Sequence, residues 1–241
     1  MGNSRFHGSS TLVEHWNGNH WAIVASPNPT GSDENVLHAV SCPSTTSCSA
    51  VGFGSTKGLV EHWNGHTWSI VTRPNPTGSD NWYLAHVSCA TTTSCFAVGS
   101  YWSGEVGKSP EKTLAEHWNG HTWSITPSPN PAGSASTVLN GVSCPTATQC
   151  FAVGHSSYQV SLGRLGVGTA QKTLVQHWDG HTWSTMRSRN PSPGGYETTV
   201  LNGVSCHRKT SCFAVGDFGG HPDPYPVQVA GNTTNLIERY G

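Results

Sequence analysis

Thr11-Leu-Val-Glu-His-Trp-Asn-Gly18 recurs three more times along the 241-residue chain, and this recurrence decides the fold. A second Trp follows the first Trp of every copy after five residues. Apolar stretches flank the Asn-Gly or Asp-Gly dipeptide, which is typical of type I′ turns with two positive-φ residues, so each copy predicts a strand, a tight turn and a strand. The other copies begin at Gly58, Thr113 and Thr173, and the Trp pairs are Trp16/Trp21, Trp63/Trp68, Trp118/Trp123 and Trp178/Trp183.

A second hairpin with two cysteines alternates with the first. In each case five small or polar residues separate the cysteines, so the two sulfurs are expected to meet across the neck of a hairpin. We expect four local disulfides, each contributing about 2 kcal/mol at most to stability because the closed loop is short. Such bonds persist in oxidising compartments. The predicted pairs are Cys42/Cys48, Cys89/Cys95, Cys144/Cys150 and Cys206/Cys212.

The two hairpins together form a four-stranded meander: strand A, the Cys turn, strand B, a variable loop, strand C, the Asn-Gly turn and strand D. A meander that repeats in this way predicts the blades of an all-β β-propeller. An apolar strand A, a strand B that ends in Ala50-Val51-Gly52 or its equivalent, and a strand D that opens with Trp resemble the blades of kelch proteins. The chain departs from kelch in lacking a double glycine after strand B and in carrying the cysteine pair. It is also similar to Cys-pinned repeat proteins exported by bacteria, whose role is unassigned.

We predict a single propeller domain over residues 11–241, after an N-terminal extension at residues 1–10. Because the chain starts with a C–D hairpin and ends with an A–B hairpin, these two are expected to share a blade and close a ring of four. The segment Thr234–Gly241 also reads as a strand C and competes for the same place, so five blades, or a cut from a longer array, remain alternatives. The repeats lie near residues 11–52, 58–99, 113–154 and 173–216, with a partial strand at 234–241.

Composition excludes some classes of partner. Charged residues make up 10% of the chain and the formal net charge is −1, so we expect no nucleic-acid binding. No apolar stretch approaches the roughly 20 residues that span a bilayer, so no membrane insertion is expected. The start of the chain, Met1–Ser10, lacks the apolar core of a secretory signal. The cysteine pairs nevertheless predict a secreted or surface-exposed protein.

Nearly all length variation between repeats lies in the B–C loops. In an up-and-down meander these loops share one face of the ring with the D–A links, and variable loops on a rigid scaffold are where function is usually placed. Aromatic rings beside carboxylates, amides and imidazoles on this face predict carbohydrate binding. A protein-interaction scaffold is the alternative, and a hydrolase or lyase at the channel mouth is a third reading. The candidate ligand-binding residues are Trp82, Tyr83, Tyr101, Trp102, Glu105, His155, Tyr158, Asp217, His221, Asp223 and Tyr225.

Other motifs receive structural interpretations. The Glu-His-Trp triplets, such as Glu116-His117-Trp118, lie inside strand C of every repeat, so they spread around the ring instead of converging as metal ligands must. We expect a buried His that bonds a Ser or the backbone. No metal site, cofactor or catalytic motif is predicted, although four strand A residues could line the central channel: His38, His86, Asn140 and Asn202. A monomer, or a dimer through the C-terminal strand, is expected.

Overall fold

The computed structural model describes residues 8–105, 109–190, 198–219 and 234–240 as an almost purely antiparallel β structure. One short 3-10 helix, η1 (Gly163–Leu165), stands among the strands of these ranges. Within them no helix is long and apolar enough to cross a membrane. The predicted all-β class is therefore confirmed.

The strands form repeated four-stranded meanders, which is the β-propeller architecture predicted from the repeats. Blade 1 contains β3 (Asn35–Ser44), β4 (Ser47–Gly54), β5 (Lys57–Trp63) and β6 (Trp68–Ile70). Blade 2 contains β7 (Asn81–Thr91), β8 (Ser94–Trp102), β9 (Lys112–Trp118) and β10 (Trp123–Ile125). Blade 3 contains β11 (Ser136–Thr146), β12 (Gln149–Ser161), β13 (Val167–Trp178) and β14 (Trp183–Met186).

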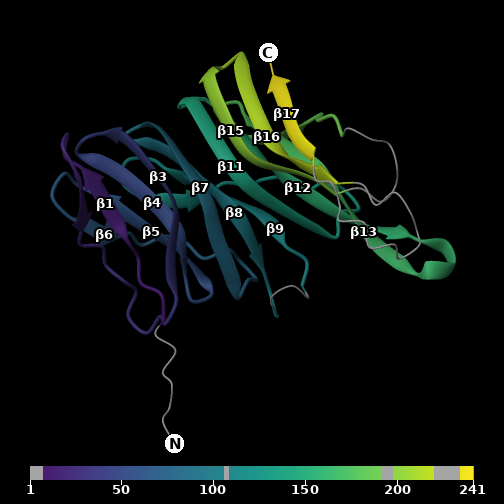
Figure 1. Cartoon of the computed structure of the whole chain (residues 1–241), viewed down its shortest axis with the longest axis horizontal. Helices are drawn as coiled ribbons and strands as arrows, with labels where there is room; N and C mark the ends of the chain where they lie inside the picture. Colours follow the sequence, from purple (N-terminus) through teal and green to yellow (C-terminus); the bar gives the residue numbers. More distant parts are fainter. Residues whose placement is uncertain (1–7, 106–108, 191–197, 220–233, 241) are drawn as a thin grey trace, which may run out of the picture.

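The two ends of the chain hold incomplete blades. The N-terminal hairpin, β1 (Val13–Trp16) and β2 (Trp21–Val24), supplies strands C and D alone. Blade 4 has strands A, B and C: β15 (Thr198–Arg208), β16 (Ser211–Gly219) and β17 (Thr234–Tyr240). The blades follow one another in chain order along an open arc, with the N-terminal hairpin and β17 at opposite ends (Figure 1).

The expected closure of a four-blade ring is not formed. Among the described strands β1 pairs with β2 alone, while β16 pairs with β17 in the register Cys212↔Tyr240. The same register joins strands B and C in blade 1, where Cys48 lies opposite Trp63. Residues 234–240 thus form the strand C that the sequence indicated. Because β17 occupies the edge of β16 that β1 would need, the two terminal hairpins stay apart.

The Asn-Gly turns differ in type from the prediction. Trp63 pairs with Trp68, so the loop between them holds four residues instead of two. Only its glycine, Gly65, has a positive φ, at 95°. The Asn64 side-chain oxygen accepts backbone N–H bonds from His66 and Thr67, both 2.9 Å long. An Asx-type turn therefore takes the place of the type I′ turn.

Apolar cores lie between successive blades. Blade 1 presents Val51 and Val60 to blade 2, whose Leu84, Val87 and Ala97 receive them in one buried cluster. A hydrogen bond also links neighbouring strands A at each complete junction. The Ser hydroxyl on one strand A accepts the backbone N–H of a Cys on the next. All three bonds measure 3.0 Å and join Cys89 to Ser41, Cys144 to Ser88, and Cys206 to Ser143.

All four predicted disulfides are present: Cys42–Cys48, Cys89–Cys95, Cys144–Cys150 and Cys206–Cys212. Each joins strands A and B at the neck of its hairpin, as the spacing indicated. Four such bonds are typical of a protein from an oxidising environment.

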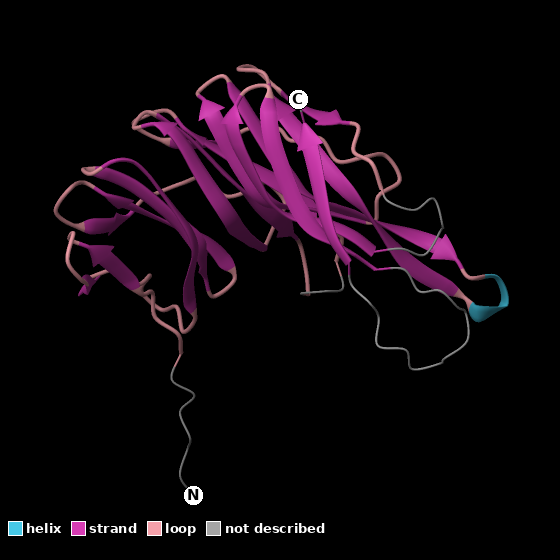
Figure 2. Cartoon of the chain, turned by 45° about the horizontal axis from the view of Figure 1, so that its top comes forward, coloured by secondary structure: helices cyan, strands magenta, loops and turns pink. Residues whose placement is uncertain are grey.

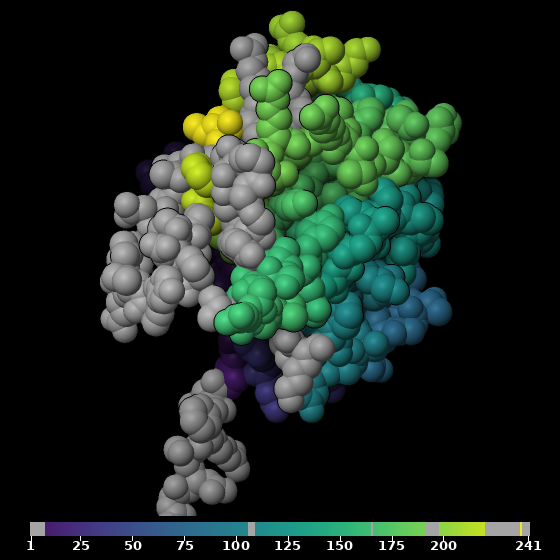
Figure 3. Space-filling model, turned by 90° about the vertical axis from the view of Figure 1, so that its right-hand side faces the viewer, coloured from purple at the N-terminus to yellow at the C-terminus, as the bar shows by residue number. Residues whose placement is uncertain are grey.

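The B–C segment of blade 3 is a strand pair, where the sequence suggested a loop. Strands β12 and β13 continue their pairing from Cys150↔Trp178 out to Ser161↔Val167, and η1 forms the tip of the hairpin. Alternating apolar residues such as Tyr158 and Val160 favour the extension. The hairpin projects beyond the blade in Figure 2, and Figure 3 views the molecule from the side on which it projects.

Candidate functional site

A cleft opens between blades 1 and 2 on the face that carries the B–C loops and D–A links. Its volume is about 380 Å³, which lies within the usual range of small-molecule sites. B–C and D–A segments both contribute, which confirms that they share a face. We call this the inter-blade cleft; its lining residues are Glu34, His38, Phe53, Ser55, Thr56, Asn81, Trp82, Tyr83 and Trp102.

A chain of ring contacts runs through the inter-blade cleft. The His38 ring centroid lies 5.5 Å from that of Phe53 and 6.3 Å from that of Tyr83. Tyr83 in turn packs edge-on against Trp102, with 6.2 Å between centroids. These distances are those of tilted and edge-to-face aromatic pairs. Phe53, Tyr83 and Trp102 are half-buried and His38 is exposed, so each ring keeps part of its surface open to a ligand.

Polar groups form the rim of the inter-blade cleft. Glu34 and Thr56 are exposed. The carbonyl oxygen of Glu34 accepts a hydrogen bond from the Ser55 N–H, and that of Thr56 accepts one from the Trp82 N–H. Ser55 has a φ of 57°, and no other non-glycine residue in the described ranges has a positive φ. Its hydroxyl lies 2.9 Å from that of Ser32. Residues in strained conformations persist where surrounding structure fixes them, and such positions cluster at binding sites.

Trp82, predicted to be solvent-reachable, is 3% exposed and belongs to the core between blades 1 and 2. The Arg73 guanidinium lies over its ring at 5.3 Å from the centroid and the Lys57 ammonium at 5.7 Å. Its indole N–H is buried without a hydrogen-bond partner. The physical reason is strand alternation: Trp82 and Leu84 point to the packed face of β7, whereas Tyr83 points to the cleft.

Tyr83 is anchored by its polar end. Burial raises the pKa of its phenol, an effect partly offset by the hydrogen bond with Ser100. The Ser100 hydroxyl also donates to the Glu111 carboxylate over 2.5 Å. The phenol is therefore neutral and fixed at physiological pH, and the ring that reaches the cleft has a defined position.

Three other predicted residues lie outside the inter-blade cleft. Tyr101 packs against the core between blades 1 and 2. Glu105 is exposed in the segment after β8. Tyr158 is half-buried on β12, with the Lys172 ammonium 5.0 Å from its ring centroid.

A second grouping lies at the junction of blades 3 and 4. Burial lowers the pKa of His155, and the nearby Asp217 carboxylate partly offsets this. Asp217 accepts a 2.8 Å hydrogen bond from the Asn202 amide. The structure thus brings His155 and Asp217 near each other, as the channel-mouth interpretation required, while His221, Asp223 and Tyr225 lie outside the described residues.

The four residues expected to line a channel do not hold equivalent positions. Each strand A has a bulge, and His38, Asn140 and Asn202 occupy it in blades 1, 3 and 4. In blade 2 the bulge falls at Ala85, and His86 is paired with Val98. Two bulge residues tie adjacent blades, because His38 Nδ1 donates to Leu84 O over 3.1 Å and the Asn140 amide donates to Leu201 O over 2.9 Å.

The histidines of the Glu-His-Trp triplets make structural contacts within their own blades, and His117 and His177 are half-buried, where the sequence predicted buried side chains. His117 Nε2 lies 3.3 Å from the Ser94 hydroxyl, and His177 Nε2 lies 2.7 Å from the Gln149 side-chain oxygen. The Glu side chain of the triplet is fully buried in blades 1 and 2, at Glu61 and Glu116. In the described ranges no three His, Cys, Asp or Glu residues are placed to hold a metal ion.

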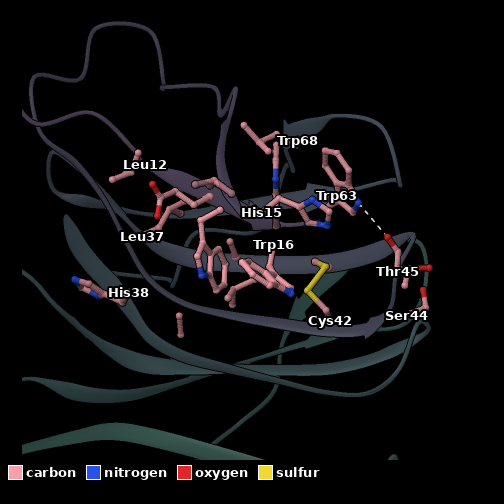
Figure 4. Close-up of a pocket in the computed structure, with 18 residues that line it drawn as sticks. Leu12, His15, Trp16, Leu37, His38, Cys42, Ser44, Thr45, Trp63 and Trp68 are labelled. Carbon is pink, nitrogen blue, oxygen red and sulfur yellow. Dashed lines mark hydrogen bonds between the residues drawn. A yellow bond between two sulfur atoms is a disulfide. The ribbon is translucent and has the colours of Figure 1, made fainter. Parts of the chain in front are cut away.

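A larger apolar groove lies at the N-terminal end of the arc, between the β1–β2 hairpin and blade 1. Its volume is about 810 Å³, and it was not predicted from the sequence. His15, Trp63 and Trp68 are among the side chains that line it (Figure 4), and the Trp63 indole donates to Thr45 O over 3.2 Å. We call this the N-terminal groove. Phe53, Ser55 and Thr56 of the inter-blade cleft were not predicted either, although the short B–C loop near them lies on the same face as Trp102.

Comparisons with known proteins leave the family open. No protein-family model matches the sequence, and no curated protein matches it significantly. A solved structure titled "YCF48 bound to D1 peptide" matches with a TM-score of 0.39 and 14% sequence identity. The match covers 80% of this chain and 66% of that chain, just under two thirds of its length. The fold assignment rests on the strand pairing described above.

Proposed function

We propose that the protein is a recognition module, secreted or displayed on a cell surface, that binds a carbohydrate unit in the inter-blade cleft. The observation that carries the proposal is the row of half-open rings, Tyr83 and Trp102, beside the exposed Glu34 and His38 in a concave site. A pyranose has an apolar C–H side and a rim of hydroxyls. An aromatic wall covers the first, and carboxylate, imidazole and hydroxyl groups hydrogen-bond the second.

The shape of the inter-blade cleft favours one or two sugar rings over a long chain. A volume of about 380 Å³ is at the small end for ligand sites. The walls come from two blades whose strands are rigidly paired, so the cleft exists before the ligand arrives. A preformed site avoids the cost of ordering loops on binding.

A glycan array probed with the folded protein tests the proposal. Trp102→Ala is expected to abolish saturable binding, because it removes one wall of the cleft. Tyr158→Ala is the matched control, since Tyr158 is a half-buried aromatic on another blade, and it should leave binding unchanged. Loss of binding in the Tyr158 variant alone would place the site elsewhere on the loop face.

A blank array from well-folded wild-type protein would contradict carbohydrate binding. In that case the alternative of a protein-interaction scaffold would gain support, and a peptide library screened against the same Trp102 and Tyr158 variants would test it. Binding of a peptide that survives Trp102→Ala would exclude the inter-blade cleft as the site for either ligand.

A further inference from the structure

The N-terminal groove lies at the place that a strand B fills at the junctions between complete blades. At the other junctions, a strand B from the preceding blade packs on the corresponding surface. Phe96 of β8 packs against His117 of its own blade, 4.6 Å between centroids, and against Trp178 and Trp183 of blade 3, at 4.9 Å and 5.1 Å. The equivalents of these three rings are His15, Trp63 and Trp68, which all line the groove.

The groove surface carries the marks of a missing neighbour. Val40 on β3 is 60% exposed, whereas its equivalents Val87 and Val142 are 2% and 1% exposed beneath the strand B of a preceding blade. Strand β1 has an open edge as well, since among the described strands it pairs with β2 alone. An apolar surface next to an unpaired strand edge is a template for an added strand.

The opposite end of the arc exposes a matching element. Phe213 and Val215 on β16 are each 48% exposed, although their equivalents Phe96 and Val98 in blade 2 are fully buried. The sequence Cys212-Phe-Ala-Val-Gly216 repeats Cys95-Phe-Ala-Val-Gly99 without change. Blade 4 therefore offers the strand B that the N-terminal groove lacks.

We propose that the N-terminal groove binds blade 4 of a second copy of the chain. Strands β15 and β16 of one copy become strands A and B, and β1 and β2 of the next copy become strands C and D of one hybrid blade. In the repeat register Val215 lies opposite Val13 and Phe213 opposite His15. Phe213 then packs on Trp63 and Trp68, as Phe96 packs on Trp178 and Trp183.

The hydrogen bond between Ser and Cys of neighbouring strands A can also form at this contact between copies. The Ser205 hydroxyl is exposed and lies at the position of Ser41, whose oxygen accepts the N–H of Cys89. Its equivalent partner is the N–H of Cys42, at the wall of the groove. The interior interface thus supplies both an apolar and a polar template for the contact between copies.

In the hybrid blade β1 replaces β17 on the edge of β16. The β1–β2 hairpin is the more complete partner because it brings a strand D, and because Ser26 beyond it already bonds Glu61 of blade 1 over 2.8 Å. Strand β17 therefore acts as a competitor that keeps the edge of β16 paired within a single copy. A head-to-tail contact of this kind uses different surfaces on the two copies and continues into rings or chains.

Sedimentation of the wild-type protein and of two blocked variants tests the proposal. Val40→Asp blocks the groove and Phe213→Asp blocks blade 4; each alone is expected to weaken association about tenfold or more. A mixture of the two variants retains one intact groove and one intact blade 4, so it should form a dimer and stop there. Removal of residues 234–241 should strengthen association, because it removes the competing strand.

Val167→Asp is the matched control, since Val167 is 68% exposed at the tip of the β12–β13 hairpin, far along the chain from both surfaces. It should associate like the wild type. A wild-type protein that stays monomeric up to high micromolar concentration, including one whose own blade 4 closes on its own groove, would overturn the proposal. So would association that is unchanged in Val40→Asp or Phe213→Asp, or a mixture of the two that remains monomeric.

Discussion

The Ser128 hydroxyl donates a 2.7 Å hydrogen bond to the side-chain oxygen of Gln176 across the junction between blades 2 and 3. Each earlier junction has a contact at the equivalent place: Ser26 bonds Glu61 over 2.8 Å, and Arg73, in the place of the serine, forms an ion pair with Glu116. All three acceptors are fully buried. At these three junctions the same position in strand C thus holds a neutral amide once and a carboxyl group twice.

Glu61→Gln is expected to stabilise the protein at neutral pH. Burial raises the pKa of Glu61 above its ordinary 4.5, and the Ser26 hydrogen bond offsets this only in part. A raised pKa in the folded state means that the stabilising effect of the proton is complete below pH 4.5 and is lost as the pH rises. The amide keeps the acceptor for Ser26 without a charge. Thermal unfolding should show a Tm gain of a few degrees at pH 8 that disappears near pH 4.

Gln176→Glu is the reciprocal variant. It places a carboxyl group where Gln176 now accepts from Ser128 and donates to Pro129 O over 2.6 Å. The variant should be less stable than the wild type at pH 8 and should approach it as the pH falls toward 4. A loss of equal size at every pH would show that the amide donor, not the buried charge, controls this position.

The Arg73–Glu116 pair should show strong coupling. Both side chains are buried, and burial raises the pKa of Glu116 to about 7 even beside the guanidinium. Glu116→Gln leaves Arg73 without its counter-charge, which typically costs about 3–5 kcal/mol for a buried pair. Arg73→Ser combined with Glu116→Gln recreates the Ser128–Gln176 contact and should recover much of that loss. Urea unfolding of both single variants and the double variant measures the coupling, and additive effects would contradict it.

Gly58 shows how the surroundings of that pair are adapted. Thr11, Thr113 and Thr173 hold this position in the other repeats that carry a Trp pair, but a Cβ on Gly58 would lie 2.2 Å from an Arg73 nitrogen. The glycine therefore makes room for the guanidinium.

Gly154→Ala is expected to destabilise the protein by more than about 2 kcal/mol. A Cβ at Gly154 would lie 2.0 Å from the Val138 carbonyl oxygen, because strand A approaches closely beside its bulge. Gly203→Ala is the control, since its Cβ would meet only the Val215 side chain at 3.7 Å. Chemical denaturation of both variants distinguishes a steric effect from a general cost of replacing glycine. A general cost would lower the free energy of unfolding equally in both variants.

The repeat allowed the blades, their strand order and the disulfides to be predicted, because each is a local pattern of turn residues and apolar alternation. Ring closure could not be predicted, since β1 and β17 carry the same strand C pattern and only their competition for β16 decides which one pairs. The burial of Trp82 was missed because the D–A link was treated as loop. The pairing of β7 begins at Asn81, which sets the alternation that turns Trp82 inward.

The candidate site was predicted in part for the same reason. Tyr83 and Trp102 lie together because β7 and β8 of blade 2 pair with Asn81 opposite Trp102, and that pairing of strands A and B follows from the meander. His155 and Asp217 lie near each other at a different junction. A single sequence shows which residues share a face but not which junction they join, since that depends on the register across the bulges.

The Cys42–Cys48 disulfide should be the first to open under a limiting reductant in the folded protein. Cys42 is exposed in the wall of the N-terminal groove, whereas none of the other disulfide cysteines is exposed. Attack by a thiolate requires access to the sulfur. Alkylation of the freed thiols followed by peptide mass spectrometry identifies the order. If copies associate through the groove, the opening rate of this bond should also fall as wild-type concentration rises, and it should be independent of concentration in Phe213→Asp. An opening rate that falls with concentration equally in both proteins would show that the contact between copies does not protect this bond. The exposure of Cys42 would still explain why it opens first.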